Sequence, residues 1–93
     1  MKTVYTVKYH ADVVSDDIPQ LPKTAKERIK TAIEQRLMTA PLAYGKPLRR
    51  NLHGLMKLRV GDYRVIYSVA ALEVIVMRIG HRKDVYKEFE RGE

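Results

Sequence analysis

The residues best suited to chemistry lie in the second half of the chain, where Lys57, Arg59 and Arg64 surround the dipeptide Gly61-Asp62. If Gly61-Asp62 forms a two-residue turn between two strands, Arg59 lies directly opposite Arg64, and Lys57 lies nearby on the same face. Like charges that face each other across a sheet are destabilising by roughly 0.2–1 kcal/mol. A phosphate between these cations would reverse that cost, because arginine binds phosphate through two parallel hydrogen bonds and lysine adds a point charge. The spacing therefore indicates either a phosphate site or a solvated basic face.

His81 and Tyr86, which follow the next stretch of alternating residues, add two further chemical possibilities. Histidine is the side-chain type that ordinarily titrates near neutral pH, so His81 could move protons. Tyr86 comes after Arg82 and Lys83, and an aromatic ring beside cations suits stacking on an unpaired base. The plainer alternatives are an ordinary surface histidine and a tyrosine that packs the C-terminal tail onto the sheet.

The formal net charge of +7 comes entirely from residues 46–87. Lysine and arginine outnumber aspartate and glutamate only there, since the two signs balance in the rest of the chain. This asymmetry is typical of proteins with a polyanionic partner, most often nucleic acid, although it also describes a merely solubilising surface. Four further basic residues of this stretch are candidates to contact RNA: Lys46, Arg49, Arg50 and Lys83.

Alternating polar and apolar residues predict the strands that would position these side chains. Residues 55–60 and 63–69 form the two arms of the hairpin, residues 72–80 follow after a weak two-alanine turn, and residues 3–9 form a first strand. One face of the hairpin carries side chains that belong in a core, namely Leu58, Val60, Tyr63, Val65 and Tyr67. The opposite face carries the cations.

Two helices are predicted before the hairpin. Residues 12–21 form a short helix that Pro19 kinks or ends. Residues 24–39 form an amphipathic helix that begins at a capping box made by Thr24 and Glu27. Its apolar stripe would cover the core face of the hairpin, and consists mainly of Ile29, Ile33 and Leu37.

The order of these elements predicts the fold class. Residues 41–54 hold two prolines and two glycines and are expected to form a loop with at most one short turn, and residues 84–90 a short helix. The resulting β-α-α-β-β-β order predicts an α+β fold, in which two N-terminal helices back a small, mainly antiparallel sheet. Residues 1–93 are expected to form a single domain, because a chain of this length makes one core.

Composition excludes several classes of protein. A hydrophobic fraction of 45% with 31% charged residues is typical of a folded globular chain. The absence of cysteine excludes disulfides and thiolate metal sites. No apolar run approaches the roughly 20 residues of a membrane span and no signal peptide is visible, so we expect a cytoplasmic protein without a membrane partner. No acidic cluster suggests a two-metal site, so we expect no metal and no other cofactor.

Two sequence segments carry a resemblance to a known family. Residues 57–67, K-L-R-V-G-D-Y-R-V-I-Y, and residues 79–86, I-G-H-R-K-D-V-Y, resemble the RelE branch of the RelE/ParE toxin superfamily. Residues 45–49 are similar to the family's loop before its second strand, and the resemblance covers nearly the whole chain. It implies a RelE-like fold and a toxin of a type II toxin–antitoxin pair, which cleaves mRNA in the ribosomal A site and inhibits translation.

The resemblance also implies partners and roles for individual residues. The partners would be a cognate antitoxin, the ribosome and mRNA, with operator DNA contacted only indirectly through the antitoxin complex. Lys57 matches the family's catalytic lysine, Arg64 the arginine that holds the scissile phosphate, and Arg82 an arginine linked to the transition state or the leaving group. Arg59 fits a supporting phosphate contact. Tyr86 resembles a tail tyrosine that stacks on the substrate, although its spacing from Arg82 is shorter than usual.

Such cleavage begins when the RNA 2′-OH attacks the adjacent phosphate, and it leaves a 2′,3′-cyclic phosphate and a 5′-OH. A base must take the 2′ proton, and cations must stabilise the charge that develops on phosphorus. Lys57 could be that base only if Arg59 and Arg64 favour its neutral form. His81 is a second candidate, and the choice stays open because this chain has Leu55 where some members have a second lysine.

Two other functions are compatible with the same fold. One is a ParE-like inhibitor that binds DNA gyrase and cleaves nothing, and the other is a catalytically degenerate member that only binds RNA or its antitoxin. The combination of Lys57, Arg64 and Arg82 favours metal-independent cleavage of mRNA over both alternatives.

Overall fold

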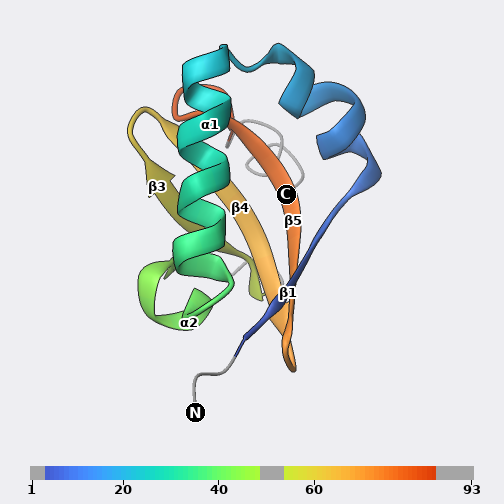
Figure 1. Cartoon of the computed structure of the whole chain (residues 1–93), viewed down its shortest axis with the longest axis vertical. Coiled ribbons are helices and arrows are strands. Elements are labelled where there is room, and N and C mark those ends of the chain that lie inside the picture. The colour runs from blue at the N-terminus through green and yellow to red at the C-terminus, as the bar shows by residue number, and fades with distance from the viewer. Residues whose placement is uncertain (1–3, 49–53, 86–93) are drawn as a thin grey trace.

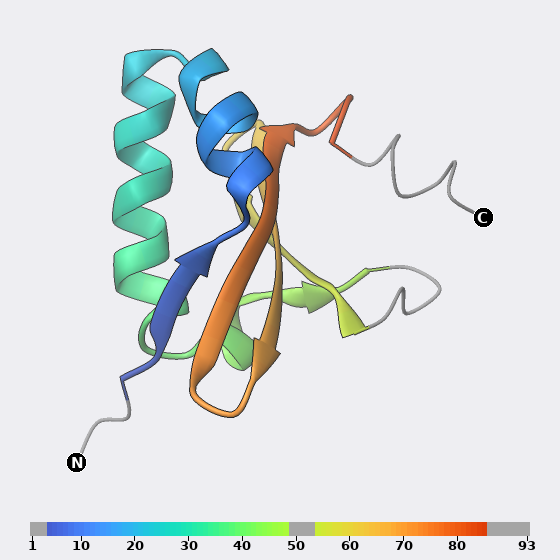
Figure 2. The same cartoon turned by 90° about the vertical axis from the view of Figure 1, so that its right-hand side faces the viewer.

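The computed structural model describes residues 4–48 and 54–85, which form a five-stranded sheet with a helical layer on one face (Figures 1 and 2). The strands lie in the order β1-β5-β4-β3-β2. Their bounds are β1 Thr6–Tyr9, β2 Lys46–Pro47, β3 Met56–Val60, β4 Tyr63–Ala70 and β5 Glu73–His81. β1 runs parallel to β5 and the other neighbouring pairs are antiparallel, so the predicted α+β fold with a mainly antiparallel sheet is confirmed.

The helical layer contains both predicted helices. The first consists of a π-helical turn η1 (Val13–Asp17) and a 3-10 turn η2 (Ile18–Gln20), which has Pro19 in its first turn and ends in extended backbone at Leu21. The second is α1 (Lys23–Ala32), which continues into the π-helical turn η3 (Ile33–Leu37). Within residues 4–48 and 54–85, no helix is both long and apolar enough to cross a bilayer.

The start of α1 differs from the prediction. The helix begins at Lys23 with Pro22 as its N-cap, and no side chain caps it by a hydrogen bond. The capping box at Thr24 and Glu27 is therefore wrong, because Thr24 already lies inside the first turn. The carbonyl of Pro22 accepts the first helical hydrogen bond, from the backbone N–H of Lys26 at 2.9 Å.

The main core lies between the helical layer and the sheet. Ile29, Ile33 and Leu37 are buried against apolar side chains of β3, β4 and β5. The β3 and β4 side chains of this core are Leu58, Val60, Val65 and Tyr67, with Tyr63 partly buried against them. The predicted core face of the hairpin and the helical stripe that covers it are both confirmed.

The loop predicted for residues 41–54 holds two short elements. They are the helical turn α2 (Pro41–Tyr44) and the edge strand β2, which pairs with the start of β3. The turn between β4 and β5 also lies one residue later than predicted, at Ala71-Leu72, because Ala70 pairs with Glu73. Of the predicted helix at 84–90, residues 84 and 85 form a turn and the rest lies outside the described residues.

Tyr67 connects α2 to the core. Its side chain is fully buried and its hydroxyl donates a 2.6 Å hydrogen bond to the Pro41 carbonyl. Burial raises the pKa of Tyr67 to about 12. Because the folded-state pKa lies above the ordinary value of 10, the protonated phenol stabilises the fold fully below pH 10, and this stability is lost as pH rises through about 12.

Tyr67→Phe should therefore change how stability depends on alkaline pH. In urea-unfolding measurements, the free energy of unfolding should fall between pH 8 and pH 11 in the wild type, and this fall should be about 1 kcal/mol smaller in the variant. At neutral pH it should be less stable by about 1–3 kcal/mol, because the Pro41 carbonyl loses its buried donor. An identical pH dependence in the two proteins would contradict the effect of burial on the Tyr67 hydroxyl.

Candidate functional site

The β3–β4 hairpin brings cations together in the expected register. Arg59 pairs with Arg64, Lys57 pairs with Ile66, and the two-residue turn is closed by the pair Val60–Tyr63. β2 adds Lys46, because this residue pairs with Lys57 from the other side. Since directly paired residues share a face, the four cations Lys46, Lys57, Arg59 and Arg64 lie on the side of the sheet away from the main core. We call this side of β2, β3 and β4 the cationic face.

The hairpin turn holds the Arg64 side chain in place. One terminal nitrogen of its guanidinium, Nη1, donates to the Gly61 carbonyl at 3.0 Å and to the Tyr63 carbonyl at 2.9 Å. Arg64 is half-buried, whereas its cross-strand partner Arg59 is exposed. A guanidinium held in this way needs little reorganisation to stabilise a developing negative charge.

The same turn also holds the backbone of Arg82. The N–H of Arg82 donates to the Asp62 carbonyl at 2.8 Å, which ties the residue after β5 to the turn between β3 and β4. The Gly61 carbonyl thus helps to position the Arg64 side chain, and the next carbonyl, of Asp62, positions the Arg82 backbone. Arg82 and Lys83 are both exposed at this end of the sheet.

A small second core supports the cationic face. Ile66 lies on this face but is fully buried, because Leu48 and Val85 cover it and Leu55 packs beside them. Val85 also lies close to Gly80, where an added Cβ would stand 3.3 Å from the Val85 Cβ. This core was not predicted, and it packs the segment after β5 onto the sheet. The one indication of this core in the sequence is Ile66, an apolar residue on a face whose other hairpin residues are mostly cations.

His81 lies on the other face. It pairs with Tyr63, and its ring contacts the Tyr63 ring edge-on, at 5.8 Å between centroids and 78° between planes. Tyr63 packs against the main core beneath the helices. The structure therefore does not bring His81 together with Lys57 and Arg64, although all three are site candidates from the sequence. Three other candidates, Arg49, Arg50 and Tyr86, lie outside the described residues.

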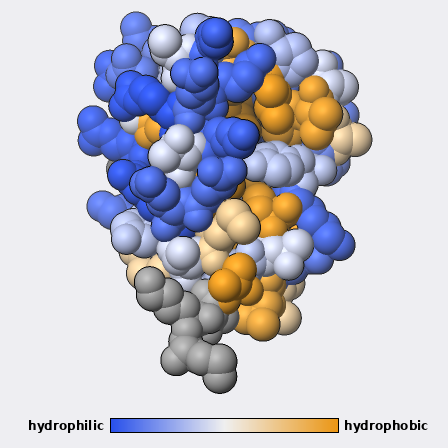
Figure 3. Space-filling model, viewed as in Figure 1, coloured by the Kyte–Doolittle hydropathy of each residue, from blue (hydrophilic) through white to orange (hydrophobic). Residues whose placement is uncertain are grey.

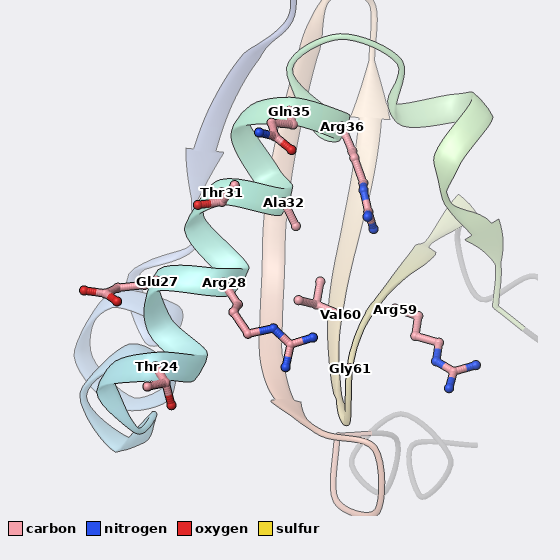
Figure 4. Close-up of a pocket in the computed structure, with 10 residues that line it drawn as sticks. All are labelled: Thr24, Glu27, Arg28, Thr31, Ala32, Gln35, Arg36, Arg59, Val60 and Gly61. Carbon is pink, nitrogen blue, oxygen red and sulfur yellow. The ribbon is translucent and has the colours of Figure 1, made fainter.

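A second basic surface lies between the helix and the hairpin. A groove of about 760 Å³ separates α1 and η3 from the end of β3, and Arg28 and Arg36 extend into it from the helical side (Figure 4). Arg28 approaches the turn so closely that a Cβ on Gly61 would lie 3.0 Å from its Nη2. Arg59 borders the groove but points away from the helix (Figure 4).

The space-filling view shows how polarity is distributed over the face of the molecule that carries α1 (Figure 3). The surface over α1 is strongly hydrophilic, and apolar surface gathers on the side of η1 and β1 (Figure 3). The exposed apolar side chains of these two segments and their neighbours include Val4, Val14 and Leu72.

Comparison with known proteins decides the family. The family model for the ParE toxin of the type II toxin–antitoxin system parDE matches residues 7–86. The chain belongs to the RelE/ParE toxin superfamily. Toxin RelG of Mycobacterium tuberculosis is 33% identical over 85 residues, which cover 89% of this chain and 97% of that protein. Toxin RelE of the same organism is 31% identical over 84 residues, which cover 85% of this chain and 87% of that protein.

Solved structures agree with this membership. A RelBE toxin–antitoxin complex of M. tuberculosis superposes with a TM-score of 0.78 at 32% identity, covering 88% of this chain and 95% of that chain. The RelB–RelE complex of Methanococcus jannaschii gives a TM-score of 0.68 at 26% identity, covering 86% of this chain and 95% of that chain. The resemblance to RelE toxins inferred from the sequence is confirmed, and this RelE/ParE member is a toxin of the type II toxin–antitoxin class.

Proposed function

We propose that this toxin is a ribosome-dependent endoribonuclease, which cleaves mRNA in the ribosomal A site and thereby inhibits translation. The observation that carries the proposal is the cationic face, on which the strand register places Lys57, Arg59 and Arg64 together and the Gly61 and Tyr63 carbonyls hold Arg64. Cations that share one face without a role in the core favour an anionic substrate, and the scissile phosphate of RNA suits the chemistry of arginine and lysine side chains. The RelE and RelG names of the relatives support the same class.

In the proposed reaction the RNA 2′ oxygen attacks phosphorus while the bond from phosphorus to the 5′ oxygen breaks. Lys57, in its neutral form, takes the 2′ proton, since His81 lies on the opposite face. Arg64 and Arg59 stabilise the charge on the phosphate oxygens, and Arg82 stabilises the negative charge on the leaving 5′ oxygen, which takes up a proton from water. The products are a 2′,3′-cyclic phosphate and a 5′-OH, and we propose that no metal ion takes part.

Ribosome dependence provides the first test. We expect the purified toxin to cut mRNA on programmed ribosomes at least about 100-fold faster than the same RNA free in solution. The ribosome would orient the 2′-OH for in-line attack, and such orientation can be worth several powers of ten. To test metal independence, we would compare the cleavage rates with and without EDTA under conditions in which the ribosomes stay intact. Efficient cleavage of naked RNA at low toxin concentration would contradict ribosome dependence.

A ParE-like inhibitor of DNA gyrase is the second candidate function, and the matched family model carries the ParE name. A ParDE structure from Pseudomonas aeruginosa shares the fold, with a TM-score of 0.60 at 16% identity. A gyrase supercoiling assay separates the candidates, because a nuclease toxin should leave supercoiling unchanged.

We also propose that a cognate antitoxin binds this toxin through an acidic segment, as both RelBE structures are of toxin–antitoxin complexes. The groove between α1 and β3 suits such a segment. Arg28 and Arg36 supply positive charge, and Ala32 and Val60 supply apolar surface in the same groove. Electrostatic attraction would accelerate association, and apolar burial would slow dissociation.

Charge reversal in the groove tests this interface. The double variant Arg28→Glu with Arg36→Glu should associate with the antitoxin about tenfold more slowly at low salt, with a smaller change in the dissociation rate. Wild-type association should slow as salt rises, because exposed charges are screened over about 10 Å at 0.1 M. The matched control is Lys26→Glu with Lys30→Glu, which makes the same charge change on α1 outside the groove. Equal slowing in both double variants, or association indifferent to salt, would contradict the groove as the binding site.

A further inference from the structure

We propose that His81 is a positioning residue, whose imidazole shapes the turn that carries Arg82 and Lys83 beside the cationic face. This inference rests on the proposed nuclease function, but its structural part can be tested without any cleavage. It also gives a different role to a histidine that the sequence indicates as a proton carrier.

The first support is the set of hydrogen bonds within the turn. Nδ1 of His81 accepts the backbone N–H of Lys83 at 3.1 Å. The His81 carbonyl accepts the backbone N–H groups of Asp84 and Val85, each at 2.9 Å. Three successive backbone donors of this turn thus converge on one residue, and one of the three bonds depends on its side chain.

The second support is the way His81 and Val85 hold the two ends of the turn. The imidazole packs edge-on against Tyr63, a residue fixed by the hairpin register and by the main core. Val85 is 1% exposed and packs on the opposite face against Leu48 and Ile66. Arg82 lies between these two fixed points, and its own N–H is bonded to the Asp62 carbonyl.

The third support is the chemistry of the imidazole itself. Nδ1 accepts the Lys83 N–H, so in this arrangement its lone pair is used within the turn. The ring lies on the helix-covered face, away from Lys57 and Arg64. His81 therefore acts on the reaction through the placement of Arg82 rather than through contact with the reacting atoms.

Three substitutions separate positioning from proton transfer. In His81→Asn the side-chain carbonyl can replace Nδ1 as the acceptor, His81→Phe keeps an aromatic ring against Tyr63 without an acceptor, and His81→Ala keeps neither. On programmed ribosomes we expect kcat to fall by about 10- to 100-fold in the Phe and Ala variants, with a smaller change in KM. The Asn variant should recover most of this loss and keep the shape of the wild-type pH–rate profile.

His10 provides a matched control, because its Nδ1 accepts the backbone N–H of Asp12 at 3.1 Å in the same local arrangement. His10 lies just after β1, outside the cationic face, so the three equivalent substitutions there should leave cleavage unchanged. Loss of cleavage in the His10 series as well would contradict a specific role for His81.

Amide hydrogen exchange gives the readout that does not depend on cleavage. Measured by NMR on the free toxin, the Lys83 amide should exchange faster in the Phe and Ala variants than in the wild type, and it should stay protected in the Asn variant. If the wild type cleaves no mRNA, the proposed function fails while this exchange pattern still tests the turn. The positioning role is overturned if Lys83 exchange is unchanged in His81→Phe. It is also overturned if His81→Asn is as impaired as His81→Ala and loses one limb of the pH–rate profile.

Discussion

Arg64→Ala is expected to lower ribosome-dependent mRNA cleavage by about 100- to 1000-fold, the usual effect of removing one preorganised donor from a developing oxyanion. The guanidinium is held at the cationic face by two turn carbonyls and lies outside both apolar clusters. The free energy of unfolding should therefore fall by no more than about 3 kcal/mol, because only these two part-buried hydrogen bonds are lost. Single-turnover cleavage on programmed ribosomes and urea unfolding would measure the two quantities.

A matched substitution removes a positive charge elsewhere. Lys30→Ala on the exposed surface of α1 gives the same change in net charge and should cleave like the wild type. Normal cleavage by Arg64→Ala would rule out its role at the phosphate, and unfolding of that variant would mean that the side chain supports the fold instead.

Gly45→Ala is expected to have the largest effect on stability, a loss of about 2–4 kcal/mol in the free energy of unfolding. A Cβ at Gly45 would overlap the Tyr67 hydroxyl and lie 3.2 Å from the Lys57 carbonyl. Tyr67 cannot move aside easily, because its ring is fully buried and its hydroxyl is bonded to Pro41. The alanine must therefore displace α2 or break that buried hydrogen bond.

Gly54→Ala is a useful comparison for this prediction. Gly54 has a φ of +73° but no atom of residues 4–48 and 54–85 within 4 Å of an added Cβ, so among these residues only backbone strain of about 1 kcal/mol opposes the alanine. Combining Gly45→Ala with Tyr67→Phe removes the overlapping oxygen, and the two substitutions should cost less together than the sum of their separate effects. A Gly45→Ala variant as stable as the wild type would contradict the close approach of these two residues.

The parts of the fold set by local periodicity could be predicted from the sequence. Period two together with the Gly61-Asp62 turn predicted the pairing of Arg59 with Arg64, and the apolar stripe of residues 24–39 predicted the face that α1 and η3 bury. Strand β2 could not be predicted, because two residues establish no period. The parallel pairing of β1 with β5 joins distant parts of the chain, and nothing in either segment specifies it.

The candidate site was predicted less completely, for reasons that are mostly non-local. The burial of Ile66 depends on Leu48 and Val85, which reach it from separate segments. The β4–β5 pairing has a register irregularity: Ile66 pairs with Arg78, but Tyr67 pairs with Val76. The alternation of side chains between the two faces of β5 is therefore interrupted at this point, and a strict period of two does not predict it. The side of the sheet on which His81 lies could nevertheless be predicted from the sequence. His81 and the apolar Ile79 are two residues apart on one strand, so their side chains share a face.

The most direct test of the account is primer extension on translated mRNA after brief induction of the toxin, in parallel with the Arg82→Ala variant. We predict new mRNA 5′ ends within coding regions, in phase with codons, for the wild type, and none for Arg82→Ala expressed at the same level. The ends should disappear when translation initiation on the reporter is blocked. Growth arrest by the wild type without new mRNA ends would contradict the central claim that this toxin acts by cleaving mRNA.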